Sequence, residues 1–266
     1  MKRYYNMKNR ISVLIVLFLM SIGVSAQIDR SKQPKPGPAP KITLKTPGEF
    51  ELKNGLKVLV VENKKLPRVS YSLTIDNIPM LEGDKAGVSS LLGAMLGNGT
   101  TSISKDDFNE EVDFLGANLG FSSSSAFASG LSKYSERILE LMADAAINPL
   151  LTEEEFQKEL DKSLEGLKAE KISVEAVAGR VRSALSYGTH HPYGEFISEE
   201  TLNSVKLENV NAFYQKYFNP NNAYLVVIGD VDFKTVKKQV KKYFGNWEKG
   251  AEITYNVPDA NPNVQY

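Results

Sequence analysis

Few residues of this 266-residue chain have the chemistry and spacing of a reactive site. The chain contains no cysteine, and its two histidines, His190 and His191, are adjacent, so their side chains diverge and rarely share one metal ion. The serine run at 122–125 is explained by a strand or a loop. Gly229-Asp230 is typical of a turn that ends a strand, because no glycine-rich segment leads into a helix there. None of these groups alone predicts catalysis.

Residues 86–100 have the frame of a metal-binding helix without its donor groups. In the pattern G-x-x-H-x-x-E-H-M-L-x-x-G-T, two histidines four residues apart bind zinc, and the glutamate is the base for the attacking water. The frame residues are present as Gly87, Met95, Leu96, Gly99 and Thr100. The three reactive positions hold Ser90, Gly93 and Ala94 instead. The segment therefore resembles the zinc helix of the insulinase/pitrilysin (inverzincin) metallopeptidases, although by itself 86–97 also fits an apolar core helix.

The resemblance continues along the chain and covers about residues 49–247. Segments that resemble parts of the family occur in the correct order at 54–58 with 61–63, 115–117, 156–170, 189–194, 219–222 and 226–231. The segment 189–194 contains His191-Pro192-Tyr193-Gly194, which is similar to the family's H-P-Y-G segment. Each match is weak alone, and their order identifies the chain as a member with a degenerate zinc motif.

The resemblance also implies a third zinc ligand, a glutamate on the family's long second helix. When Glu159 is aligned with the first glutamate of that helix, the ligand position falls on Gly166. The neighbouring Glu165 is displaced by one residue, or about 100° around the helix. All three ligands and the base are therefore missing together, which predicts a chain that binds no metal and is inactive alone.

The N-terminal residues are typical of a secretory signal peptide. Four basic residues within 2–10 precede an apolar run at 11–24, which is short for a membrane span. Val24-Ser25-Ala26 is a small-residue cleavage site, and a retained anchor is the alternative. The sequence thus predicts an exported protein, for which we favour the periplasm over secretion, with no membrane span after cleavage.

Composition excludes further classes of function. Removing residues 1–26 removes four of the 32 basic residues and none of the 32 acidic ones, which leaves 28 basic against 32 acidic residues. This balance does not favour nucleic-acid binding. Without cysteine there is no disulfide framework, so an ordinary hydrophobic core must stabilise the domain.

The predicted organisation is a signal peptide (1–26), a proline-rich linker (27–48), one domain (49–248), and a linker (249–266) toward a second domain. The pattern of residues predicts strands at 49–53, 56–62, 69–75, 117–132 (two strands) and 223–228, with a hairpin turn at Asn54-Gly55. It predicts helices at 86–97, 105–115, 134–148, 152–171, 174–187, 207–218 and 233–244. Clustered strands and helices favour an α+β fold with a mixed, largely antiparallel sheet.

The resemblance implies a function that needs partners. In two-subunit members of the family, a zinc-bearing and a metal-free subunit enclose an unfolded peptide between them. We therefore expect a non-catalytic subunit that forms a heterodimer with a zinc-bearing partner and takes part in proteolysis. The alternatives are a peptide-binding or scaffold protein without proteolysis, and an active enzyme whose site is not recognised.

The family also presents a strand edge to extended peptides, which pair with it through main-chain hydrogen bonds. The corresponding residues are Asn118, Leu119, Gly120, Phe121 and Ser122. Gly120 and Phe121 stand where the family prefers Asn-Ala, so the edge departs from the family pattern. The alternative is an ordinary edge strand that its partner subunit covers.

Overall fold

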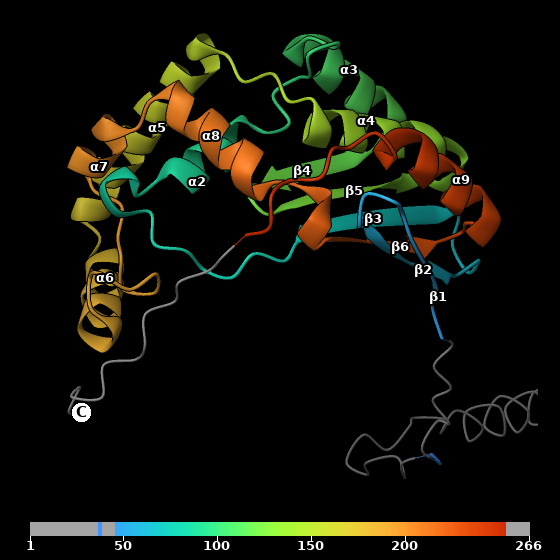
Figure 1. The fold of residues 1–266 in the computed structure, drawn as a ribbon, viewed down its shortest axis with the longest axis horizontal. Coiled ribbons are helices and arrows are strands. Elements are labelled where there is room, and N and C mark those ends of the chain that lie inside the picture. Colours follow the sequence, from blue (N-terminus) through green and yellow to red (C-terminus); the bar gives the residue numbers. More distant parts are fainter. Residues whose placement is uncertain (1–36, 39–45, 254–266) are drawn as a thin grey trace, which may run out of the picture. The chain divides into compact units, whose positions relative to one another are not determined.

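The computed structural model describes residues 37–38 and 46–253 (Figure 1). The chain divides into residues 1–44 and 45–266, and every helix and strand given below belongs to the second unit. The predicted signal peptide, residues 254–266 of the predicted C-terminal linker, and the leader apart from 37–38 and 46–48 lie outside the described residues. In the described part of the chain, no helix has the length and apolar character needed to cross a bilayer.

A six-stranded sheet forms the centre of the domain, in the order β1-β2-β6-β3-β5-β4. Its strands are β1 (Gly48–Glu51), β2 (Lys57–Glu62), β3 (Arg68–Ile75), β4 (Asn118–Ser122), β5 (Ser125–Leu131) and β6 (Ala223–Gly229). The β2–β6 pair is parallel and the other pairs are antiparallel. The predicted α+β fold with a mixed, largely antiparallel sheet is confirmed.

The other elements are α-helices, most of them on one side of the sheet, with short 3-10 turns at 83–85, 132–134 and 220–222. The α-helices are α2 (Val88–Met95), α3 (Lys105–Leu115), α4 (Ser135–Ile147), α5 (Glu153–Lys171), α6 (Val174–Tyr187), α7 (Glu199–Ser204), α8 (Leu207–Tyr217) and α9 (Phe233–Phe244). Helix α7 was not predicted from the sequence. It is a single short segment with a capping box, in which Ser198 and Thr201 satisfy each other's backbone amides.

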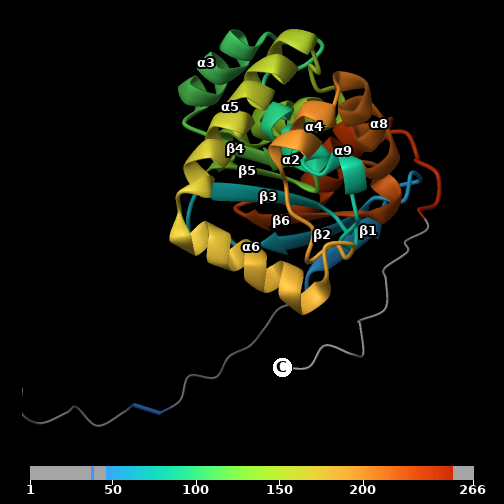
Figure 2. The same cartoon turned by 90° about the vertical axis from the view of Figure 1, so that its left-hand side faces the viewer.

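Strand β3 shows why the sheet has one covered face. Val69, Tyr71 and Leu73 alternate with Ser70, Ser72 and Thr74, and only the first set is buried. The buried face is covered by helices that include α4 and α9, and Figures 1 and 2 show them on the same side of the sheet. The core therefore lies between this sheet face and the helical layer.

Side-chain caps begin two helices where the sequence predicts them. The Ser104 hydroxyl accepts a hydrogen bond from the backbone N–H of Asp107 at 3.2 Å, at the start of α3. Thr152 does the same for Glu155 at the start of α5. These caps fix the start of α5, the helix that carries position 166.

The β1–β2 turn differs from the predicted two-residue hairpin. The backbone N–H of Leu52 donates to the carbonyl of Leu56, so residues 53–55 form a three-residue loop. Gly55 has φ +94° there, a left-handed conformation that favours glycine. The buried Asn54 amide donates to the carbonyls of Phe244 and Trp247, at 2.8 and 2.9 Å, and thereby joins this loop to the end of α9.

Candidate functional site

Helix α2 presents two of the three degenerate positions to solvent. Its apolar residues Val88, Leu91, Leu92 and Met95 are buried, whereas Ser90 and Ala94, four residues apart, are exposed. Residues at this spacing share one helix face. The helix therefore keeps the orientation that a pair of zinc-binding histidines would need, with a hydroxyl and a methyl group in their places.

Gly93, at the position of the catalytic base, faces protein and is half-buried. A Cβ at this residue would lie 3.1 Å from the backbone nitrogen of Ser123 and 3.4 Å from Cα of Ser122. Ser122 is the last residue of β4, and Ser123 is the first residue of the turn that leads to β5. The backbone at the end of β4 therefore packs closely against Gly93, and a side chain at 93 would need that backbone to shift slightly.

Gly166, on α5, has the opposite environment. A Cβ there would meet no heavy atom within 4 Å. Gly166 and Ser90 line one surface pocket of about 430 Å³, together with residues that include Ser163, Leu167, Arg180 and Phe196. The structure therefore brings together two of the positions that the sequence aligned with zinc ligands, and the space between them is open.

The residues present at this site do not fit a zinc ion. Zinc in proteins takes nitrogen, thiolate or carboxylate ligands, whereas Ser90 offers one neutral hydroxyl and neither Ala94 nor Gly166 has a donor atom. Across the described ranges, no group of three His, Cys, Asp or Glu residues could hold a metal ion. Glu170 and Glu195 also line the pocket, but two carboxylates do not complete a zinc site in the described residues.

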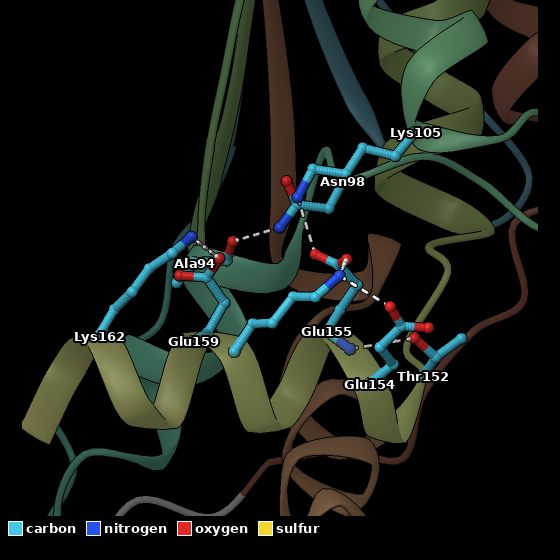
Figure 3. Close-up of polar contacts among 9 residues, drawn as sticks. Ala94, Asn98, Lys105, Thr152, Glu154, Glu155, Glu159 and Lys162 are labelled. Carbon is cyan, nitrogen blue, oxygen red and sulfur yellow. Dashed lines mark hydrogen bonds and ion pairs between the residues drawn. The ribbon is translucent and has the colours of Figure 1, made fainter.

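Two carboxylates of α5 do project toward the end of α2 that bears Ala94, and lysines bind both of them (Figure 3). Lys105 and Lys158 contact Glu155 at 2.8 and 3.1 Å, and Lys162 contacts Glu159 at 2.6 Å. The hydrogen bond from Lys105 is the main reason why the pKa of Glu155 is lowered. Both carboxylates are therefore charge-compensated within the chain.

Glu165, one residue before the predicted ligand position, points elsewhere. Its side chain is 71% exposed and pairs with Lys168 at 2.7 Å on the solvent side of α5. This agrees with the rotation expected for a one-residue displacement along a helix.

The two histidines lie outside this pocket and differ from each other. His190 is exposed, whereas His191 is buried, and its Nδ1 accepts a hydrogen bond from the backbone N–H of Tyr193 at 3.1 Å. The His191 ring stacks on Tyr187 with ring centres 5.4 Å apart. This geometry gives His191 a packing role in the turn after α6.

The predicted peptide-pairing segment is strand β4, at one edge of the sheet. In the described structure it pairs with β5 on one side and with no strand on the other. Because Ser122 and Ser125 close the hairpin as a hydrogen-bonded pair, the backbone groups of Leu119 and Phe121 point toward the free edge. The five edge residues carry no charge, so the edge lacks the charged groups that often protect such strands.

The edge lies directly beside α2. The ring of Phe121 packs where Gly97, just after α2, has no side chain: a Cβ at Gly97 would be 2.4 Å from the ring. With the turn against Gly93, this contact fixes the edge strand along the degenerate helix. The serine run predicted as strand or loop forms the turn, where Ser122 and Ser125 hydroxyls lie 2.8 Å apart.

Sequence reasoning did not identify Arg180, Phe196, or the Lys105–Glu155 pair as parts of this region. Lys158 and Lys162 could have been found, because each lies three residues after a glutamate on one helix. Lys105 is 50 residues from Glu155, and no local pattern connects them.

Comparison with known proteins supports the fold. An uncharacterized zinc protease of Rickettsia felis is 26% identical over 212 residues, which cover 77% of this chain and 51% of that protein. The structure of a peptidase M16 inactive domain from Pseudomonas fluorescens has a TM-score of 0.72 at 21% identity, and covers 82% of this chain and 54% of that one. The first half of the periplasmic protease PqqL from Escherichia coli has a TM-score of 0.66 at 17% identity, with coverages of 80% and 49%. This chain therefore spans about half the length of each of these three proteins.

Family models identify the protein family of the chain. A model described as peptidase M16 inactive domain matches residues 204–265. A model described as insulinase (peptidase family M16) matches residues 57–191, which contain α2, β4 and α5. On this match, the chain belongs to the insulinase family, peptidase family M16.

Proposed function

We propose that this chain is a non-catalytic subunit of an exported insulinase-type zinc peptidase. It forms half of a peptide-enclosing chamber, and a zinc-bearing partner of the same family forms the other half. The chain itself contributes no metal ligand and no catalytic base. Its own role is to shape the chamber and to hold extended peptide.

One observation carries this proposal: the scaffold of the family's site is kept while its chemistry is absent. Ser90 and Gly166 line one pocket, and Ala94 shares the exposed face of α2 with Ser90. None of these residues can replace a histidine or glutamate as a zinc ligand. A fold that keeps this arrangement without donors is suited to a chamber whose reactive centre belongs to another polypeptide.

The free edge of β4 supports a role in peptide binding. An extended peptide can add to this edge as another strand, using the outward backbone groups of Leu119 and Phe121. The pairing depends on main-chain groups, so it tolerates varied peptide sequences. The same edge also favours a second candidate function, a peptide-binding or scaffold protein that works without a zinc partner.

Export rests on the N-terminal sequence and on one relative. Residues 1–26 have the pattern of a signal peptide, and the similar protease PqqL from Escherichia coli is described as periplasmic. We therefore propose a periplasmic location for the subunit and for its zinc-bearing partner.

Peptide hydrolysis by mixed components tests the proposal. The partner tested is a family member from the same source that carries the complete H-x-x-E-H motif. Peptide hydrolysis is measured for this partner alone, for this chain alone, and for their mixture. We expect hydrolysis by the mixture well above the sum of its parts, and none by this chain alone. The absence of both a gain and a complex would overturn the subunit proposal.

A matched pair of edge variants separates the two candidate functions. Leu119→Pro removes the outward N–H, whereas Leu119→Ala removes the same side chain and keeps that N–H. If peptide pairs with β4, Leu119→Pro lowers peptide binding and Leu119→Ala does not, as measured by fluorescence anisotropy of a labelled extended peptide. Strong binding by this chain alone, with no gain in any mixture, would favour the scaffold function.

A further inference from the structure

Helix α6 carries its large apolar side chains on the side that faces away from the domain. None of its 14 residues is buried. The exposed fractions are 84% for Val174, 39% for Val177, 52% for Val181 and 74% for Leu185. These residues recur at spacings of three and four, so they form one continuous stripe, called here the α6 stripe.

The opposite side of α6 is the one that is partly covered. Ala176, Gly179, Arg180 and Ser183 are half-buried, and they are small or polar. Helix α9 shows the usual arrangement, because its apolar residues Val236, Val240 and Phe244 are buried. In Figures 1 and 2, α6 stands apart from the helical layer that covers the sheet. Since a helix of this length is marginally stable alone, an exposed apolar stripe about 17 Å long calls for a cover.

The charges beside the α6 stripe indicate what covers it. Glu175 and Arg182 are exposed, and because they are seven residues apart they lie on the same flank of the helix. Neither forms an ion pair within the described part of the chain. If a second α6 packs antiparallel on the stripe, Glu175 of one copy lies beside Arg182 of the other, and the pairing occurs twice.

We propose that α6 is the contact through which two copies of this chain pair, with their α6 stripes packed antiparallel around a two-fold axis. Such an interface is isologous, because the same stripe and the same flank serve both copies. It goes beyond the function proposed above, since it requires neither a zinc-bearing partner nor a peptide. One helix pair is small compared with a standard interface of about 1,600 Å², so the dimer is weak and forms in the micromolar range.

Sedimentation velocity of residues 27–266, which contain every described helix and strand, tests the pairing. The protein is measured from about 5 to about 500 µM, a range that brackets a weak dimer. We expect a reversible monomer–dimer equilibrium that Val181→Glu weakens at least about tenfold, because it buries two unpaired charges. The control is Leu66→Glu, at a side chain that is 66% exposed in the β2–β3 turn, which should leave the equilibrium unchanged. Circular dichroism establishes that both variants fold.

A charge exchange tests the antiparallel direction. Glu175→Arg alone places two arginines together at each contact and should weaken the dimer about tenfold. The double variant Glu175→Arg/Arg182→Glu restores opposite charges and should recover the wild-type dissociation constant. A parallel pair, or nonspecific association through apolar groups, would give no such recovery.

Three results would overturn the proposal. The first is a monomer at every concentration, which is also the result expected if the other half of a longer family chain covers the stripe. The second is a dimer that Val181→Glu does not weaken. The third is a dimer whose affinity does not recover in the double charge variant.

Discussion

Two positions of the degenerate site, 93 and 166, both hold glycine but have opposite surroundings. Gly93 faces the turn between β4 and β5, whose backbone would contact a Cβ there at 3.1 Å. Gly166 faces an open pocket, where a Cβ would meet nothing within 4 Å. The position aligned with the base is therefore closely packed against backbone, whereas the position aligned with this ligand has open space but no donor.

This difference indicates two ways in which a reactive site is lost. At Gly166, a side chain with the right chemistry still has room. At Gly93, a glutamate requires the turn to move, and the turn belongs to the hairpin that presents the β4 edge. The close packing at Gly93 therefore ties α2 to the strand that we propose for peptide pairing. Substitutions in α2 and in α5 test this comparison between the two positions.

Gly97→Ala should lower the stability of the fold more than the other variants, because Gly97 lies where the end of α2 contacts the Phe121 ring of β4. Its φ of +82° is left-handed, and a Cβ there would lie 2.4 Å from the Phe121 ring. The backbone strain and the displaced ring together should lower the free energy of unfolding by about 3 kcal/mol in urea titrations. Gly120→Ala, where a Cβ meets nothing within 4 Å, is the control and should not destabilise. Equal stability of the two variants would contradict a tight α2–β4 contact.

Gly93→Glu should destabilise by about 2 kcal/mol, within the range for overpacking. The cause is the displacement of Ser122 and Ser123, because the glycine leaves only 3.1 Å to the backbone. Hydrogen exchange should show faster exchange in the β4–β5 turn in addition to the lower unfolding free energy. A stable variant with an unchanged turn would show that the position is open after all.

The paired carboxylates of α5 should give a smaller, pH-dependent effect. The pKa of Glu155 is lowered in the folded chain, mainly by Lys105, relative to about 4.3 when unfolded. Its contribution is therefore present above the unfolded pKa and is lost as the pH falls through the folded pKa. Between pH 6 and pH 3, wild type should lose about 1 kcal/mol more stability than Glu155→Gln.

The control for this measurement is Glu165→Gln, which removes an exposed pair with Lys168 on the same helix. Exposed pairs of this kind contribute little, so this variant should follow the pH dependence of wild type. If Glu155→Gln also follows wild type, the lysines around Glu155 do not stabilise the α2–α5 region.

Local signals in the sequence predicted the elements well. Ser104 and Thr152 cap the helices they were expected to begin, because capping depends on residues three positions apart. The degenerate positions could be predicted from the sequence because a spaced motif stays readable when its donors are replaced. That Ser90 and Gly166 would share a pocket followed only from the family resemblance, since 76 positions separate them.

Contacts between distant segments could not be predicted in the same way. The sequence aligns Gly93 with the family's base, but the backbone that packs against Gly93 comes from the distant β4–β5 hairpin. Asn54 was expected to serve a turn, and its amide also binds carbonyls 190 and 193 residues away. The α6 stripe follows the pattern of a buried helix face, yet it is exposed in this chain, because periodicity shows that a face is apolar but not what covers it.

Gly166→Glu should have the smallest effect, and it completes the comparison with Gly93→Glu. Glutamate is a better helix former than glycine by up to about 1 kcal/mol, whereas a negative charge near the C-terminus of α5 and close to Glu170 offsets part of that gain. The unfolding free energy should therefore stay within about 0.5 kcal/mol of wild type. The same glutamate substitution would then cost about 2 kcal/mol at 93 and almost nothing at 166. If Gly166→Glu destabilised as much as Gly93→Glu, the pocket at 166 would not be open in solution, and both positions would have been lost in the same way.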